Sequence, residues 1–181
     1  ASYIDPDPLS TVRRYADPRE REIVALLSSS LALGRVDLIL RAIEEVLLRL
    51  PKPVTGIAGI SRSEAEDRSE GFLYRFFRPH HLGRLIYAIG WLLERHGSLE
   101  EAFQEASQGE GLQVGLRRFV DLLLEAAGGD TSILISRPER GSAAKRLHLF
   151  LRWMVRQDAV DPGGWTLFSP RELLVPEDTH M

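Results

Sequence analysis

The sequence predicts an all-α protein. Nearly every long segment repeats its apolar residues at intervals of three and four, which is the period of a helix and not of a strand. Proline, glycine, serine and aspartate stand where such segments begin and end. The 181 residues, 44% hydrophobic and 27% charged, are enough for a helical domain with a buried core. We expect about seven to nine helices.

The first third of the chain contains three helix patterns. Asp7 and Asp17 are each followed by a proline, and an aspartate cap before a proline is a common helix start. The second of these helices is expected to end at Gly34. Residues 35–50 form a strongly amphipathic third helix that a proline stops. Residues 52–63, "KPVTGIAGISRS", are expected to form a loop.

The rest of the chain continues the helical pattern. Residues 128–141 are predicted to be a loop with a short extended piece at Ile133–Ile135, and "DPGGW" is predicted to be a turn. The remaining expected elements are a helix over 80–97, a short helix started by a Ser98–Glu101 capping box, a helix over 112–129, a helix over 142–157 capped by Ser142, and a short helix started by Ser169.

The composition excludes several kinds of site. These 181 residues contain no cysteine, which removes thiolate nucleophiles, disulfides and cysteine-held zinc or iron–sulfur clusters. The five histidines lack the spacing of a metal site, so we predict neither a metal nor a cofactor. No apolar run reaches the roughly 18 residues of a membrane span, so we expect no membrane partner and a cytoplasmic location. The net charge of −3 means that any nucleic-acid footprint must be local, and the oligomeric state stays open.

The last long helix breaks the electrostatic pattern of the others. It carries Lys145, Arg146, Arg152 and Arg156 and no acidic residue. Two of these cations lie near its start, where the helix dipole disfavours positive charge by about a few tenths of a kcal/mol. Lys145, His148, Arg152 and Arg156 fall within one narrow arc, because separations of 3, 7 and 11 residues are close to whole turns.

Two interpretations of this basic arc are open. In the first, the helix start is an anion site: "ERGSAAKR" supplies Gly141 for close backbone approach and Ser142 as a cap, which suits a phosphate. A lysine in such a place is a candidate amine nucleophile. In the second, the arc is an ordinary solvated face whose cations pair with acids from elsewhere in the fold.

A second stretch, "YRFFRPHH" (residues 74–81), mixes aromatic side chains with arginines. Such a stretch can stack on bases and hold phosphates. It can equally consist of core aromatic residues flanked by surface charge.

Four blocks of the sequence carry a resemblance to a known family. They are "YIDPDPLSTVRRYADPREREIVALLSSSLALGRVDLIL", "GFLYRFF", "GSAAKRLHLFLRWMVRQDAVDPGGW" and "PEDTH". They are similar to signature blocks of a bacterial family of conserved hypothetical proteins, domain of unknown function 2400, which itself resembles the archaeal 8-oxoguanine DNA glycosylases. The resemblance covers nearly the whole chain, and the third block is the most specific.

The resemblance implies the helix-hairpin-helix DNA glycosylase fold, in which two helical lobes hold DNA in the cleft between them. We therefore expect one glycosylase-like domain over 1–181, with one lobe formed by 1–60 plus 142–181 and the other by 61–141. Related proteins continue through further helices. We therefore expect this chain to be truncated at its C-terminal end.

The resemblance also implies two catalytic residues. In the superfamily a lysine starts the helix after the hairpin, and an aspartate follows in a Val-Asp-Thr-His-like motif. Lys145, after "RPERG", and Asp178, in "PEDTH", match these positions. Asp178 would stabilise the developing oxocarbenium sugar, and Lys145 would attack C1′ to give a Schiff base after the target base has flipped out.

The expected function is therefore base-excision repair by a DNA glycosylase that acts on a damaged base such as an oxidised purine, with or without an AP-lyase step. The expected partner is damaged duplex DNA, whose phosphates would contact Gly141, Ser142, Arg146 and Arg152. The alternative is a non-catalytic helical module that binds DNA or a protein.

Overall fold

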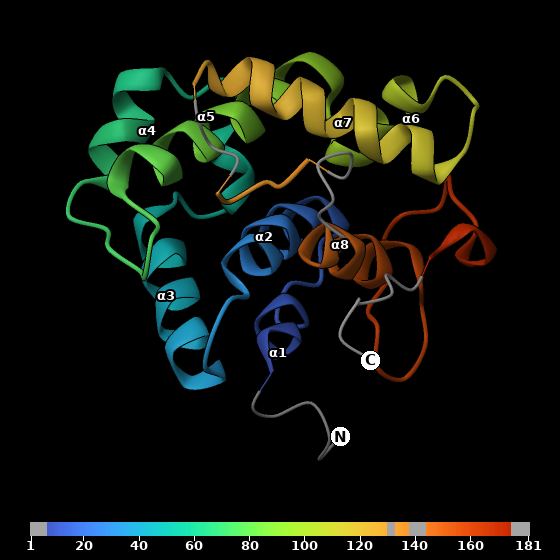
Figure 1. Ribbon diagram of the computed structural model, residues 1–181, viewed down its shortest axis with the longest axis horizontal. Helices are drawn as coiled ribbons and strands as arrows, with labels where there is room; N and C mark the ends of the chain where they lie inside the picture. The colour runs from blue at the N-terminus through green and yellow to red at the C-terminus, as the bar shows by residue number, and fades with distance from the viewer. Residues whose placement is uncertain (1–6, 130–132, 138–143, 175–181) are drawn as a thin grey trace.

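The structure confirms the predicted all-α class. It is a computed structural model that describes residues 7–129, 133–137 and 144–174. Eight α-helices within these ranges account for more than half of the chain (Figure 1). Extended pairing in the described residues is limited to two isolated bridges. The elements are α1 (Pro8–Val12), α2 (Pro18–Leu31), α3 (Val36–Arg49), η1 (Val54–Ile57), α4 (Arg62–Ser69), α5 (Pro79–His96), α6 (Leu99–Ser107), α7 (Leu112–Ala127), α8 (Lys145–Val155) and η2 (Pro170–Glu172), where η marks a 3-10 turn.

Helix α2 lies at the centre of the molecule (Figure 1). It contacts α1, α3, η1, α6 and α8, and the side chains of Glu22–Leu31 are all buried. Helices α4 to α7 pack mainly against one another. The buried apolar side chains form one cluster that includes residues from all eight helices. The division into two DNA-holding lobes stays a prediction.

The predicted helix starts are confirmed where a capping side chain is present. The carboxylates of Asp7 and Asp17 accept hydrogen bonds from backbone N–H groups of their own helices at 2.8 and 2.9 Å. Ser98 accepts one from the N–H of Glu101 at 3.1 Å. Ser169 and its capping box start η2, which is shorter than the predicted helix. Each cap satisfies a backbone N–H that has no partner within its helix.

Two predicted helix boundaries and one predicted extended segment were wrong. Helix α2 ends at Leu31 and not at Gly34, because Ala32 has a non-helical backbone conformation. Helix α8 begins at Lys145 and not at Ser142, because Ala144 adopts a left-handed conformation (φ 43°) that a helix cannot continue through. The expected extended piece at Ile133–Ile135 is a turn.

Helix α4 was missed altogether. Much of it follows the segment predicted as a loop, and its eight residues, RSEAEDRS, include a single apolar side chain, Ala65. Periodicity therefore gave no signal, although Ser61 caps it. In the stretch 74–81, Tyr74 and Phe77 are buried and Phe76 is exposed, so two of the three aromatic side chains belong to the core.

Glu22 is a buried carboxylate that joins three parts of the fold. One of its oxygens accepts a hydrogen bond from the N–H of Leu99 (2.6 Å), and the other accepts from the N–H of Glu100 (3.0 Å) and from the indole of Trp165 (2.8 Å). Glu22, which belongs to α2, thereby satisfies free N–H groups at the N-terminus of α6. Negative charge is favourable at a helix N-terminus. Burial raises the pKa of Glu22 to about 7, even though these hydrogen bonds act in the opposite direction.

Helices α5 and η1 approach closely at Gly90. A Cβ there would lie 2.3 Å from the carbonyl oxygen of Ile57 and 2.7 Å from a methyl group of Ile60. We expect Gly90→Ala to lower the free energy of unfolding by about 1–3 kcal/mol, although the same change in an open helix is stabilising by about 1 kcal/mol. Urea denaturation measures the difference. A gain in stability would show that the two segments are not in contact.

Candidate functional site

The predicted basic arc of α8 faces a cavity of about 540 Å³. This volume lies within the range of small-molecule sites, about 300–1,000 Å³. The arc supplies one wall of the cavity, and residues after α8 supply much of the rest. The lining residues are Lys145, His148, Leu149, Arg152, Arg156, Gln157, Pro170, Leu173 and Leu174.

The opposite face of α8 fixes the arc toward the cavity. Leu147, Phe150, Leu151 and Met154 are buried, and α8 packs against the central helix α2. The ring of Phe150 meets that of Trp165 edge-on, with centroids 5.2 Å apart. Because half of the helix surface is held in the core, the basic side chains cannot rotate away from the cavity without breaking this packing.

Lys145 lies in the first turn of α8, is exposed, and lines the cavity. Lys145 and Lys52 are the only lysines in the 181-residue sequence, in which all other basic side chains except histidine are arginines. An arginine guanidinium remains charged and does not form Schiff bases, whereas a lysine amine does. Among the basic residues of the cavity, Lys145 alone therefore combines a cation with a candidate nucleophile.

His148 lies one helical turn after Lys145. Its Nδ1 atom is buried and has no hydrogen-bond partner among the described residues. Burial lowers the pKa of His148 below its ordinary value of 6.5. The imidazole is therefore neutral at neutral pH and adds no positive charge beside Lys145.

Two aspartates beyond α8 hold the arginines of the cavity. The Nε of Arg152 donates to Oδ2 of Asp161 at 2.9 Å, and the Nε of Arg156 lies 3.5 Å from the same oxygen. Arg156 also pairs with Asp158 at 2.6 Å. The side chain of Asp161 is 1% exposed, whereas both arginine side chains are about half exposed. Pairing with acids from elsewhere in the fold, the second interpretation of the arc, thus applies to Arg152 and Arg156.

The loop that carries these aspartates, residues 158–165, is tied to the start of the chain. Arg13 donates to two of its carbonyl oxygens at 2.7 and 2.9 Å, and Arg21 donates to two more at 3.0 and 3.3 Å. Hydrogen bonds from two N–H groups of the loop, that of Asp161 first, hold the pKa of Asp158 below its ordinary value. The 158–165 loop is therefore a fixed support for the cavity.

Other residues of the predicted site lie elsewhere. Arg146 donates to the carbonyl oxygens of Ser30 and, at 2.8 Å, Ile133, and burial lowers its pKa. These bonds join α8 to the end of α2, so Arg146 has a structural role, and its contact with DNA stays a prediction. Gly141, Ser142 and Asp178 lie outside the described residues. Sequence reasoning missed Asp161, for which the only signal was its position in the turn "DPGGW".

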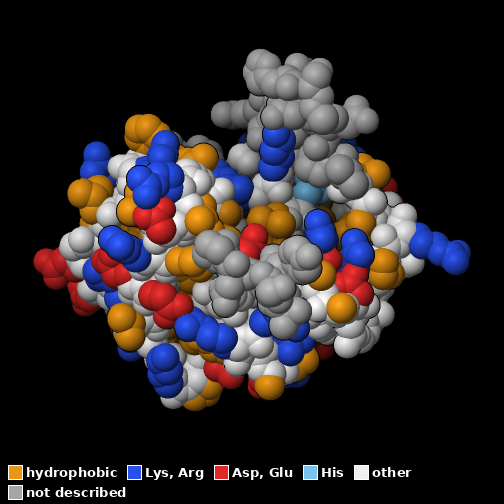
Figure 2. All heavy atoms as spheres, turned by 90° about the horizontal axis from the view of Figure 1, so that it is seen from below, with side chains coloured by type: hydrophobic (Ala, Val, Ile, Leu, Met, Phe, Trp, Pro, Cys, Tyr) orange, Lys and Arg blue, Asp and Glu red, His pale blue; other side chains and the backbone are white. Residues whose placement is uncertain are grey.

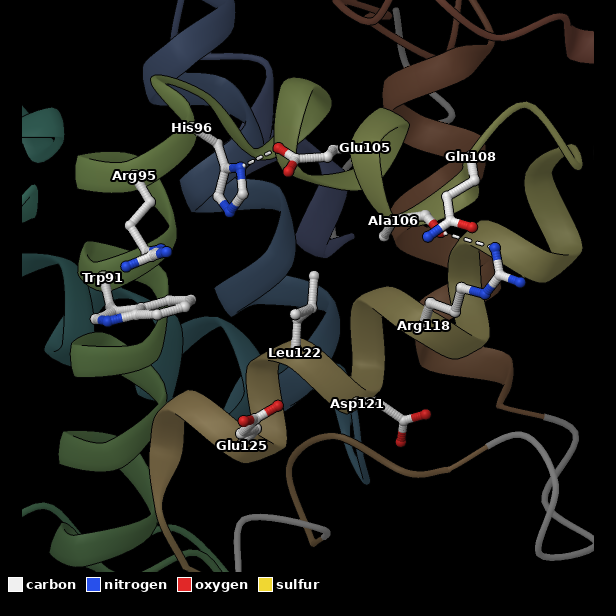
Figure 3. Close-up of a pocket in the computed structure, with 10 residues that line it drawn as sticks. All are labelled: Trp91, Arg95, His96, Glu105, Ala106, Gln108, Arg118, Asp121, Leu122 and Glu125. Atoms are coloured by element: carbon white, nitrogen blue, oxygen red, sulfur yellow. Dashed lines mark hydrogen bonds and ion pairs between the residues drawn. The ribbon is translucent and has the colours of Figure 1, made fainter.

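A second cavity, of about 380 Å³, lies between α5, α6 and α7 (Figure 3). Its charged side chains engage neighbours: His96 is 2.7 Å from Glu105, Arg118 pairs with Glu110, and Arg95 stacks over the ring of Trp91. Three acidic side chains line it alongside these cations. This balance gives no preference for an anion, so the cavity of α8 is the stronger candidate.

Across the described residues, the surface has a mixed character. Basic and acidic side chains are interspersed on the face seen from below (Figure 2). In the described part of the chain, no group of three or more histidine, aspartate and glutamate side chains is arranged to hold a metal ion. No helix in the described ranges has the length and apolarity needed to cross a membrane.

Fold and site together define a class: a protein that is helical throughout its described elements and in which one basic helix face lines a cavity. The chain belongs to the family described as "Protein of unknown function (DUF2400)", which matches residues 7–181. Comparisons with curated proteins and with solved structures each found no match. The predicted family is confirmed, and its likeness to DNA glycosylases stays a prediction.

Proposed function

We propose that this protein is a DNA glycosylase that acts on a damaged base, such as an oxidised purine, in duplex DNA. One observation carries the proposal: the amine of Lys145, one of two lysines in the sequence, lines a cavity large enough for a base, together with two arginines. The resemblance of the sequence blocks to glycosylase-like proteins supports the same assignment.

The cavity offers the groups that such a reaction needs. The flipped base would pack against the apolar side chains of Leu149, Leu173 and Leu174, while the arginines face the phosphates beside it. The amine of Lys145 would form a bond to C1′ as the bond from C1′ to the base breaks. The base would leave with the bonding electron pair and take up a proton. The sugar ring would then open as the bond from C1′ to the ring oxygen breaks; the ring oxygen would keep the electron pair and take up the second amine proton, which leaves the Schiff base. Asp178 is proposed to stabilise the positive sugar, as the resemblance implies.

The test uses the full-length protein and a panel of duplexes, each with one damaged base. We expect base release from at least one duplex and, with borohydride present, a covalent protein–DNA adduct, because reduction converts a Schiff base into a stable amine. Chromatography measures the released base, and denaturing electrophoresis measures the adduct. DNA binding without release or adduct on every lesion would instead support the non-catalytic DNA-binding module.

A further inference from the structure

The pairing between Arg152 and Asp161 is incomplete in a way that points to a ligand. Arg152 uses only its Nε toward Asp161, and its two Nη groups have no partner among the described residues. Asp161 uses only Oδ2, while its buried Oδ1 has no partner in the same part of the chain. A bidentate pair would engage both oxygens and an Nη group. In this pair the Nε of Arg152 is anchored by Asp161, while its two Nη groups stay available for a ligand.

We propose that Asp161 is a positioning residue that aims the two Nη groups of Arg152 into the cavity of α8 as a fork for a DNA phosphodiester. The choice of DNA as the source of the phosphate rests on the proposed function. Two parallel N–H groups of a guanidinium match two oxygens of a phosphate. Arg156 lies one turn further along the same arc and lines the same cavity, so it adds positive charge beside the fork.

The supports of Asp161 explain why the fork is rigid. Arg13 and Arg21 hold the 158–165 loop through four hydrogen bonds to its carbonyl oxygens, and the N–H of Asp161 donates to Asp158 at 2.8 Å. A guanidinium that is already held in its binding orientation loses less conformational entropy when the phosphate arrives. The Asp161 side chain is only 1% exposed, so it holds Arg152 from behind and does not contact the phosphate itself.

Two variants of Asp161 distinguish its positioning of Arg152 from the effect of its own negative charge on DNA binding. Asp161→Ala and Asp161→Asn remove the same negative charge, so charge alone predicts that both bind DNA more tightly than the parent. The asparagine keeps an oxygen that accepts from Nε of Arg152, and the alanine does not. We expect Asp161→Ala to bind a lesion-bearing duplex about 2- to 10-fold more weakly than Asp161→Asn, which is the cost of fixing one mobile side chain. Equal or tighter binding by Asp161→Ala would overturn the proposal.

The role of Arg152 is tested directly. Fluorescence titrations measure the affinity for the same lesion-bearing duplex over a range of salt concentrations, and they also serve for the Asp161 variants. We expect Arg152→Ala to reduce the slope of log affinity against log salt by about 0.9, the value for one phosphate contact. Arg152→Lys keeps the positive charge but lacks the two parallel N–H groups. We therefore expect it to have the salt slope of the parent but a weaker affinity for the duplex. Arg41→Ala is the matched control, because Arg41 is exposed on α3 and has no ion-pair partner among the described residues. An unchanged slope in Arg152→Ala would overturn the proposal even if Asp161→Ala fails to fold.

Inorganic phosphate, compared with chloride at equal ionic strength, separates a DNA phosphodiester from a free anion. We expect phosphate to compete weakly with the duplex for the parent protein and not to compete for Arg152→Ala. Phosphate that binds the parent as tightly as the duplex does would overturn the assignment to DNA. Failure of the parent to bind any duplex at low salt would overturn the proposed function together with this ligand. A different result would overturn only the role of Arg152. In it, the parent releases the base, and the slope of log affinity against log salt is the same for Arg152→Ala as for the parent.

Discussion

Replacing Lys145 with glutamine is expected to abolish the borohydride-trapped adduct and to slow base release by several orders of magnitude. Glutamine keeps much of the length and polarity of lysine but has no nucleophilic amine, so the Schiff base cannot form. The residue is exposed at the start of α8, and its replacement removes no buried contact from the core. Folding should therefore be unchanged, and DNA affinity should fall only by the contribution of one positive charge.

The sequence provides a matched control for this experiment. Lys52→Gln makes the same chemical change at the other lysine, which is exposed in the segment between α3 and η1. We expect Lys52→Gln to form the adduct at the rate of the parent. An adduct of undiminished yield with Lys145→Gln would assign the nucleophile to a different amine. Normal trapping by Lys145→Gln and loss of trapping by Lys52→Gln would move the active site away from the cavity of α8.

Removing the carboxylate of Glu22 is expected to cause a large loss of stability. Glu22→Ala would leave three donors without their acceptor: the buried N–H of Leu99, the buried indole of Trp165 and the partly buried N–H of Glu100. Each unsatisfied donor costs about 1–3 kcal/mol, so we expect a loss of about 3–5 kcal/mol in the free energy of unfolding, after water replaces part of the lost bonding. Denaturant titration at pH 7 measures it, and a loss below 1 kcal/mol would contradict this role.

The same residue predicts a pH dependence of stability. The pKa of Glu22 is raised from 4.5 to about 7 in the folded protein, so the folded state holds this proton more tightly than the unfolded state. Its stabilising contribution is therefore complete below about pH 4.5 and is lost as the pH rises through about 7. The loss over this window is about 3 kcal/mol, because one pKa unit corresponds to about 1.4 kcal/mol.

Glu22→Gln isolates this contribution, because glutamine does not titrate. Other groups titrate equally in the two proteins, so the difference between their free energies of unfolding reports Glu22. We expect the advantage of the parent over Glu22→Gln to shrink steadily between pH 4.5 and 7. Parallel curves for the two proteins would show that the pKa of Glu22 is the same in the folded and the unfolded state.

The sequence predicted those parts of the fold that are encoded locally. Helix periods, together with caps such as Asp7, Asp17 and Ser98, depend on residues within one or two turns of each other. Helix α4 escaped because its polar sequence carries no period, and the start of α8 was misplaced because a left-handed Ala144 has no sequence signal. The failures thus occurred where a helix has no apolar period and where the backbone turns without a glycine or proline to mark it.

The candidate site likewise has a part that could be predicted from the sequence and a part that could not. The arc of Lys145, His148, Arg152 and Arg156 was predictable, because the helix period alone places these side chains on one face. The partner of Arg152 was not predictable, since Asp161 reaches it only after the 158–165 loop folds back against α8. Glu22 is a further example, because its donors on α6 and the 158–165 loop are brought to it by tertiary packing alone.

The hydrogen bonds that Arg13 and Arg21 donate to the 158–165 loop determine at what stage of protein synthesis the cavity of α8 can form. The four hydrogen bonds from Arg13 and Arg21 span between 141 and 147 residues of sequence. Helix α2 leaves the ribosome more than 100 residues before α8, which covers one of its apolar sides. Helices α4 to α7 find their partners locally, whereas α2 must wait with apolar surface exposed to water. The cavity of α8 is therefore expected to form only after the 158–165 loop has been made.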